Sequence, residues 1–302
     1  MTSANHQATN QVARHIPRDT TGRKEHGHLV KAPGPGLRKR GMTAPCTRSG
    51  AASTVQPRLH LILGPTCSGK TRRATAAAAR GECPVIALDR IQCHPEIAVG
   101  SGRPPQRDLA DTTRLYLDDR PLSYGPITAR SAVDRLVRTQ RRLLSGTTTL
   151  ILEGGSISLL RALLQRTDWC RGWLVHATVC IDGGAHQYAT RVSTEVRRML
   201  GYTTAALGAR TFQDELAALW DDPVTRKQAY RLVGYRQAID LCERDGLTPR
   251  QLAAPGGHRR RQDLEDTLRQ GHLAYASQQR QAFAKALPAL SELAERVEVR
   301  EV

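Results

Sequence analysis

Residues 64–71, which read GPTCSGKT, form the segment of this sequence best suited to bind a diphosphate. They match the pattern GxxxxGK(S/T) in full and lie between a short apolar run at 59–63 and an alanine-rich stretch at 71–80, which predict a strand and a helix. In this arrangement the loop N–H groups and the helix N-terminus attract phosphate oxygens, Lys70 adds a full charge, and the Thr71 hydroxyl can bind Mg²⁺. We therefore predict a diphosphate site containing Gly64, Thr66, Cys67, Ser68, Gly69, Lys70 and Thr71.

A second candidate for chemistry is Asp89, which follows directly after the apolar run at 84–88. This run is typical of a buried strand. Because open parallel sheets bind ligands at the carboxyl ends of their strands, we expect Asp89 to lie at the same sheet edge as the phosphate loop. An aspartate in this position can be a general base, a metal ligand or the N-cap of a turn. A third predicted strand, at 149–152, ends at Glu153, to which the sequence assigns no role.

The elements around these residues alternate between strand and helix. The stretch at 129–144 places Val133, Leu136 and Val137 on one helical face, and a further strand is expected at 173–181. The rest is typical of helices, near 186–200, 212–221, 224–244 and 259–286. We predict an α/β fold, a P-loop NTPase-like parallel sheet with flanking helices and a helical C-terminal layer across the carboxyl ends of the strands.

Three regions are expected along the chain. Residues 1–57 lack apolar periodicity and carry nine Lys or Arg against two acidic residues, so we predict a disordered basic N-terminal extension, with Met42 an alternative start. Its arginines would suit an organelle transit peptide, but it has no amphipathic apolar stripe. Residues 58–182 are expected to form the P-loop α/β core and residues 183–302 a mainly helical C-terminal region.

Composition limits the classes of function. The 302 residues carry a formal net charge of +17, which suits polyanionic partners without establishing nucleic-acid binding. The sequence has no apolar run of about eighteen residues, so no membrane span is expected. Its seven cysteines include no CxxC pair, which favours a reducing cytoplasm and makes Cys67 a small tolerated residue rather than a redox group.

Several segments together resemble one family. In order, they are GPTCSGKT at 64–71, ALDRIQC at 87–93, GSGRP at 100–104, RLYLDDRPL at 114–122 and LILEGGSISLL at 150–160. The set resembles the bacterial adenylate isopentenyltransferases, also called adenylate dimethylallyltransferases, of cytokinin biosynthesis. The resemblance is dense over 59–160, scattered over 173–285 and absent from the N-terminal extension, residues 1–57.

This resemblance implies an activity and a role for each matching residue. The family transfers a dimethylallyl group from dimethylallyl diphosphate to the N6 amine of AMP. By resemblance, Asp89 is the general base, Thr66 hydrogen-bonds the bridging oxygen, and Lys70 with Mg²⁺ offsets charge on the leaving diphosphate. Ser101 would lie near the adenine, and Arg191 would point at the diphosphate from the side opposite the loop.

Two positions depart from the family pattern. Agrobacterial members read Ile-Asp-Gly-Tyr-Arg where this chain has Val233 in the second place, and they carry a histidine near the position of Tyr275. Our hypothesis is that both side chains border the prenyl tail. The pocket would then favour dimethylallyl diphosphate over its hydroxylated analogue, because a buried hydroxyl without partners costs about 1–3 kcal/mol.

Other functions remain open at this stage. A tRNA dimethylallyltransferase shares the loop, the aspartate and a Gly-Tyr motif and would suit the positive charge, but no inserted anticodon-arm domain is recognisable. A P-loop kinase acting on a small molecule and a non-catalytic nucleotide-binding module are further alternatives. We expect small-molecule substrates, no nucleic acid and no membrane; the choice among AMP, ADP and ATP and the oligomeric state stay open.

Overall fold

The computed structural model describes residues 56–181, 184–203, 209–254 and 257–301. All of these residues belong to one compact unit. The predicted N-terminal extension lies outside them, apart from residues 56 and 57.

Within the described residues, six strands form one sheet in the order β3-β2-β4-β1-β5-β6, and every neighbouring pair is parallel. The predicted parallel α/β sheet is therefore confirmed. Three of the strands, β1, β2 and β4, end at the edge where the candidate residues lie. The strands are β1 (Arg58–Leu63), β2 (Val85–Ala87), β3 (Arg114–Tyr116), β4 (Thr149–Gly154), β5 (Leu174–Ile181) and β6 (Arg296–Glu301).

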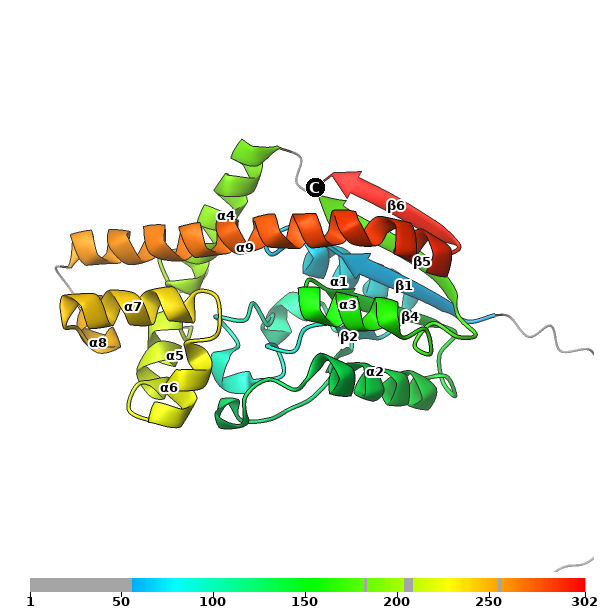
Figure 1. The fold of residues 1–302 in the computed structure, drawn as a ribbon, viewed down its shortest axis with the longest axis horizontal. Helices are drawn as coiled ribbons and strands as arrows, with labels where there is room; N and C mark the ends of the chain where they lie inside the picture. The colour runs from blue at the N-terminus through cyan, green and yellow to red at the C-terminus, as the bar shows by residue number, and fades with distance from the viewer. Residues whose placement is uncertain (1–55, 182–183, 204–208, 255–256, 302) are drawn as a thin grey trace, which may run out of the picture. The chain divides into compact units, whose positions relative to one another are not determined.

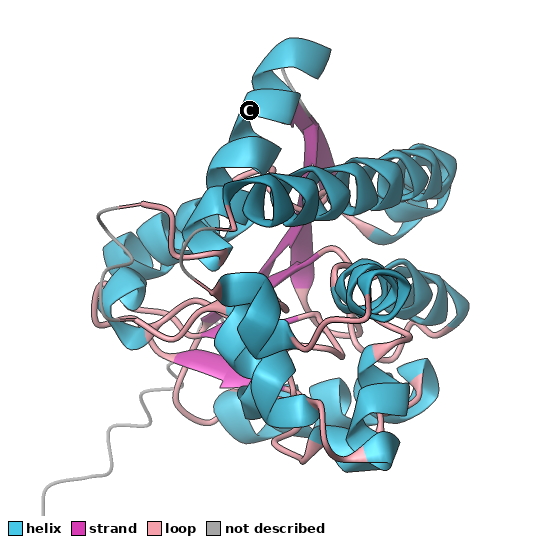
Figure 2. Cartoon of the chain, turned by 90° about the vertical axis from the view of Figure 1, so that its left-hand side faces the viewer, coloured by secondary structure: helices cyan, strands magenta, loops and turns pink. Residues whose placement is uncertain are grey.

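Helices lie on both sides of the strands (Figure 2). The single helix predicted at 224–244 is wrong: two helices occur there, α6 and α7, which residues 230–234 separate, and Gly234, with a φ of +88°, is the N-cap of α7. β3, α3, α8 and β6 have no counterpart among the sequence predictions. The helices are α1 (Lys70–Gly81), α2 (Ala129–Leu143), α3 (Ile157–Gln165), α4 (Ala185–Met199), α5 (Phe212–Leu219), α6 (Pro223–Ala229), α7 (Tyr235–Asp245), α8 (Pro249–Ala253) and α9 (His258–Leu293).

The helix α9 joins two hydrophobic cores. Leu264 and Leu268, near its start, pack with α4, α5 and α7, whereas Phe283 and Leu290 pack with the sheet and α3. Figure 1 shows α9 running from the α5–α8 group past the sheet to β6. Most described residues after 183 lie in helices, and the last described segment returns to the sheet as β6. Because α9 spans both cores, it can carry side chains directly to the edge of the sheet.

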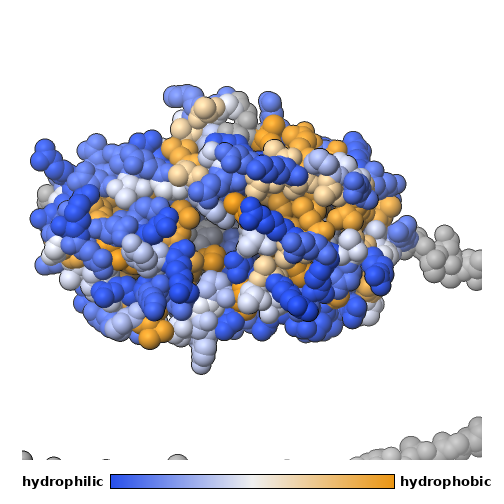
Figure 3. All heavy atoms as spheres, in the orientation of Figure 1, coloured by the Kyte–Doolittle hydropathy of each residue, from blue (hydrophilic) through white to orange (hydrophobic). Residues whose placement is uncertain are grey.

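Hydrophilic side chains dominate the face shown in Figure 3, and hydrophobic ones gather mainly over the C-terminal half of α9. No helix in the described part of the chain has the length and apolar character that crossing a bilayer requires.

Candidate active site

The phosphate loop connects β1 to α1, and its backbone has the form of an anion-binding loop. Cys67 and Gly69 both adopt positive φ angles, 58° and 74°, a backbone form typical of loops that bind anions through N–H groups. The Lys70 ammonium donates to the Pro65 carbonyl at 2.7 Å. Burial raises the pKa of the Cys67 thiol to about 11, so this loop side chain stays protonated and neutral. These features suit the binding of an anion by amides and one lysine.

A cavity of about 1010 Å³ opens beside this loop. It brings together predicted residues from the phosphate loop, three further loops, α1, α4 and α9. Gly64 and Ser68 are not on its wall: Ser68 is buried, and a Cβ at Gly64 would lie 2.8 Å from the Cys180 carbonyl, so these two shape the loop from beneath. The predicted residues on the wall are Thr66, Cys67, Gly69, Lys70, Thr71, Asp89, Ser101, Arg191, Val233 and Tyr275.

Sheet topology sets the spacing between Asp89 and the phosphate loop. Asp89 follows β2, the loop follows β1, and β4 lies between these two strands. Neighbouring strands are about 4.8 Å apart, so the two groups start about 10 Å apart at the sheet edge. This span has room for an amine about 3 Å from the carboxylate, with the attacked carbon about 3–3.5 Å beyond it. The arrangement therefore suits a transfer between a bound diphosphate and a nucleophile.

Asp89 both caps a turn and faces the cavity. Its Oδ1 atom accepts from the backbone N–H of Ile91 at 2.7 Å and, more weakly, of Gln92 at 3.4 Å. Burial raises the pKa of this carboxyl, and the charge of Glu153 adds to the rise, while the two amides and Lys70 act in the opposite direction. The turn fixes the orientation of the carboxyl, and the raised pKa strengthens it as a proton acceptor.

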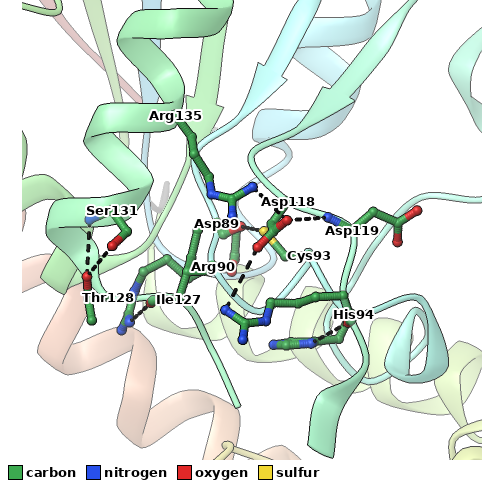
Figure 4. Close-up of polar contacts among 11 residues, drawn as sticks. Asp89, Arg90, Cys93, His94, Asp118, Asp119, Ile127, Thr128, Ser131 and Arg135 are labelled. Carbon is green, nitrogen blue, oxygen red and sulfur yellow. Dashed lines mark hydrogen bonds and ion pairs between the residues drawn. The ribbon is translucent and has the colours of Figure 1, made fainter. Parts of the chain in front are cut away.

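The segment RLYLDDRPL supports the turn that carries Asp89 (Figure 4). The Cys93 thiol donates to the Asp89 carbonyl at 3.5 Å, and the backbone N–H of Arg120 donates to the Cys93 carbonyl at 3.1 Å. Asp118 in turn forms an ion pair with Arg135 of α2, at 2.8 Å. This segment thus acts on the site through the backbone of the Asp89 turn.

Glu153 is a site residue whose role the sequence analysis left unassigned. It stands at the end of β4, where its carboxylate pairs with Arg114 of β3 at 2.6 Å, and both side chains are almost fully buried. Its other oxygen accepts from the Thr71 hydroxyl at 3.4 Å. The glycines after it allow close packing, since a Cβ at Gly154 would lie 2.3 Å from the Leu88 carbonyl. The available signal was an acidic residue ending a strand next to the phosphate-loop strand.

Glu215 on α5 is a second functional residue that the sequence analysis missed. It is fully buried and accepts three hydrogen bonds, from the backbone N–H groups of Val99 (2.8 Å) and Gly100 (2.9 Å) and from the Tyr235 hydroxyl (2.6 Å). Burial raises the pKa of this carboxyl, while the three donors lower it. These bonds hold the loop that brings Ser101 to the cavity. No spacing pattern in a single sequence identifies such a contact.

The remaining predicted residues lie on the helical side of the cavity. Arg191 of α4 faces it, and its Nε and Nη2 atoms have no hydrogen-bond partner among the described residues. Burial and the nearby charge of Asp89 raise the pKa of Tyr275 to about 12, so its hydroxyl stays protonated. Val233 lines the cavity immediately before Gly234, the N-cap of α7. The structure thus places Arg191, Tyr275 and Val233 on one cavity; their roles stay predictions.

Comparison with known proteins identifies the relatives of this chain. Residues 57–293 match the family described as Isopentenyl transferase. An adenylate dimethylallyltransferase of Rhizobium radiobacter is 39% identical over 230 residues, which cover 74% of this chain and 92% of that protein. Another, from Agrobacterium tumefaciens strain T37, is 41% identical over 196 residues, covering 64% of this chain and 78% of that protein.

Solved structures show the same fold at much lower identity. A tRNA isopentenylpyrophosphate transferase from Bacillus halodurans aligns with a TM-score of 0.59 and 14% identity, covering 81% of this chain and 90% of that one. A tRNA isopentenylpyrophosphate transferase from Staphylococcus epidermidis gives 0.55 and 14%, with 75% and 90% covered. At this identity the likeness concerns the fold alone.

Proposed function

Because the chain belongs to the isopentenyl transferase family, we propose that it is an adenylate dimethylallyltransferase. It would move a dimethylallyl group from dimethylallyl diphosphate to the N6 amine of AMP. The observation that carries this proposal is that the phosphate loop and Asp89 face one cavity with a single strand, β4, between the strands that bear them. The curated relatives named adenylate dimethylallyltransferase, at 39–41% identity, support the choice of acceptor.

On the leaving-group side, the bond between the allylic carbon and the bridging oxygen breaks, and diphosphate departs with both electrons. Lys70 and the loop amides stabilise the charge that develops, an effect that preorganised donors commonly supply. Arg191 is proposed to contact the same anion from α4, and its two nitrogen atoms without partners among the described residues support this. Thr66 donates its hydroxyl to the bridging oxygen.

On the acceptor side, the N6 nitrogen forms a bond to the allylic carbon and loses one proton to the Asp89 carboxylate. An aromatic amine is a weak nucleophile, and general-base assistance typically contributes about 10²–10⁴ in rate. Ser101 on the neighbouring loop is proposed to contact the adenine. Val233 and Tyr275 are proposed to border the prenyl tail.

Magnesium is the cofactor that we propose. The described residues contain no cluster of three or more His, Cys, Asp or Glu side chains suited to hold a metal. Mg²⁺ usually takes one or two protein oxygens and completes its shell with phosphate and water, so Thr71 and its partner Glu153 offer a fitting donor set. When bound, the ion would offset charge on the departing diphosphate.

The alternative acceptor is an adenosine in tRNA. The structural likeness to tRNA-modifying enzymes, at 14% identity, concerns the fold only, whereas the closer sequence relatives are named for adenylate.

The free thiols of the six described cysteines suit a reducing cytoplasm, the compartment that we propose.

The test is incubation of the purified full chain with dimethylallyl diphosphate and Mg²⁺, offered either AMP or undermodified tRNA, followed by mass analysis. We expect a five-carbon adduct on the adenine of AMP and none on tRNA. An adduct on tRNA alone would favour the alternative. Consumption of ATP without prenyl diphosphate, and no adduct, would indicate a kinase.

A further inference from the structure

The backbone of Thr66 is held from both sides by helices of the C-terminal layer. Its N–H donates to the Gln279 side-chain oxygen of α9 at 2.8 Å, and its carbonyl accepts from the Tyr188 hydroxyl of α4 at 2.6 Å. These partners lie 213 and 122 residues away in the sequence. No other loop residue has both backbone groups bound to side chains in this way among the described hydrogen bonds, so Thr66 is the most constrained point of the loop.

Gln279 uses both ends of its amide. While its oxygen accepts from Thr66, its nitrogen donates to the Gly155 carbonyl at 2.7 Å, and the side chain is only 3% exposed. A Cβ at Gly155 would lie 2.8 Å from that nitrogen, so the glycine after β4 makes room for the contact. The site requires an acceptor on one side and a donor on the other, which a buried amide supplies and a hydrocarbon or a carboxylate does not.

The hydrogen bonds to Gln279 and Tyr188 also determine where the Thr66 hydroxyl lies. Because both peptide groups of Thr66 are fixed, the direction of its Cα–Cβ bond is fixed as well, and the side chain lies on the cavity wall. Among the described residues the hydroxyl contacts the Cys67 sulfur, 3.8 Å away, a weak contact that leaves it able to bind an oxygen. The Thr66 N–H, by contrast, is already committed to Gln279 and does not serve the anion.

We propose that Gln279 and Tyr188 are positioning residues that aim the Thr66 hydroxyl at the bridging oxygen of the prenyl diphosphate. This inference rests on the proposed function, and it assigns to the helical layer a part in leaving-group departure. Reactions of this kind are sensitive to placement, since a shift of about 1 Å can cost about a hundredfold in rate.

The first test is a double-mutant cycle on the full chain with AMP and dimethylallyl diphosphate. Gln279→Leu is expected to lower kcat about tenfold with little change in KM for either substrate. In a background of Thr66→Ala the same change should have almost no further effect, because the hydroxyl that Gln279 positions is gone. Gln281→Leu, on the exposed face of the same helix, is the matched control and should leave kcat unchanged.

Two further variants change single hydrogen bonds while preserving the size of the side chain, so that a loss of activity is not caused by misfolding. Tyr188→Phe keeps the ring and removes only the hydroxyl that holds the Thr66 carbonyl, so a smaller loss in kcat, also absent in Thr66→Ala, is expected. Gln279→Glu tests the hydrogen-bond pattern directly. A neutral carboxyl accepts and donates as the amide does, whereas a carboxylate cannot donate to Gly155. The activity of this variant relative to the parent chain should therefore rise as the pH falls.

The outcomes separate the two proposals. If the parent chain forms no adduct with AMP, the proposed function fails and the inference falls with it. If the parent chain forms the adduct but the losses from Gln279→Leu and Tyr188→Phe add fully to that of Thr66→Ala, the inference alone is overturned. A pH-independent ratio for Gln279→Glu would likewise contradict it.

Discussion

The two walls of the cavity are built in opposite ways. The phosphate wall comes from one contiguous run, residues 64–71, which forms the loop after β1 and the first turn of α1 and contains a single lysine. The acceptor wall is assembled from distant segments: Asp89 follows β2, the Ser101 loop is held by Glu215 of α5, and Tyr275 comes from α9. The residues of the diphosphate site thus come mainly from one local segment, to which the helical layer adds the contacts that fix Thr66, whereas the acceptor site has no such local segment and is assembled only by the fold.

The largest effect is expected on the phosphate wall. Lys70→Met removes the one full positive charge of the loop, and we expect kcat to fall by about 10²–10³, the usual cost of losing a donor that stabilises developing negative charge. Initial rates with AMP and dimethylallyl diphosphate measure it. Lys285→Met, an exposed lysine of α9, is the control. Equal rates for the parent chain and Lys70→Met would mean that the loop does not bind the leaving group.

A change of nearly the same size is expected on the acceptor wall. Asp89→Asn keeps an oxygen that can accept from Ile91 and so preserves the turn, but it removes the base. We expect kcat to fall about a hundredfold while KM for dimethylallyl diphosphate stays within about twofold. The matched control is Asp119→Asn, an exposed neighbour of the supporting segment. A large rise in KM for the donor would instead place Asp89 on the phosphate wall.

Glu215→Gln should weaken substrate binding at the acceptor wall and leave binding at the phosphate wall almost unchanged. The amide can no longer accept from all three donors, Val99, Gly100 and Tyr235, and one buried group left unpaired costs about 1–3 kcal/mol of folding free energy. We expect KM for AMP to rise about tenfold and KM for the prenyl donor to stay nearly constant. Thermal unfolding and paired kinetics with the exposed control Glu292→Gln test this. Equal rises in both KM values would indicate a general loss of structure.

The smallest effect concerns the prenyl pocket. Val233→Asp introduces a polar partner where this chain has an apolar side chain, and we expect the ratio of kcat/KM for the hydroxylated donor over dimethylallyl diphosphate to rise about tenfold. Val224→Asp, whose parent valine is 55% exposed, is the control. Equal use of both donors by the parent chain would contradict the hypothesis for this pocket.

Much of the fold was predictable from sequence because its signals are local. Buried runs such as Val85–Ala87 are continuous and apolar, and the phosphate-loop pattern is contiguous. β3 has only three partly buried residues, and β6 alternates charged and apolar residues at the sheet edge, so neither has the signature of a buried strand. The predicted helix at 224–244 ran through residues 230–234, which separate α6 from α7 and end at Gly234 with its positive φ.

The sequence could predict site residues that follow a strand or belong to a contiguous motif, but not the contacts that orient them. Asp89 could be placed at the sheet edge because it directly follows a strand. The contacts that orient the site join residues far apart: Glu153 with Arg114, Glu215 with Gly100, and Gln279 with Thr66 are separated by 39, 115 and 213 positions. A buried glutamine or glutamate carries no local pattern that names its partner, so these contacts required the structure.

The most direct test of Asp89 as the base is the pH dependence of kcat/KM. The base must be ionised to accept the amine proton, so activity falls below its pKa; because burial and Glu153 raise that pKa, the acidic limb should lie above the ordinary aspartate range. We expect such a limb in the parent chain and its disappearance in Asp89→Asn. An acidic limb that is unchanged in Asp89→Asn would contradict the account.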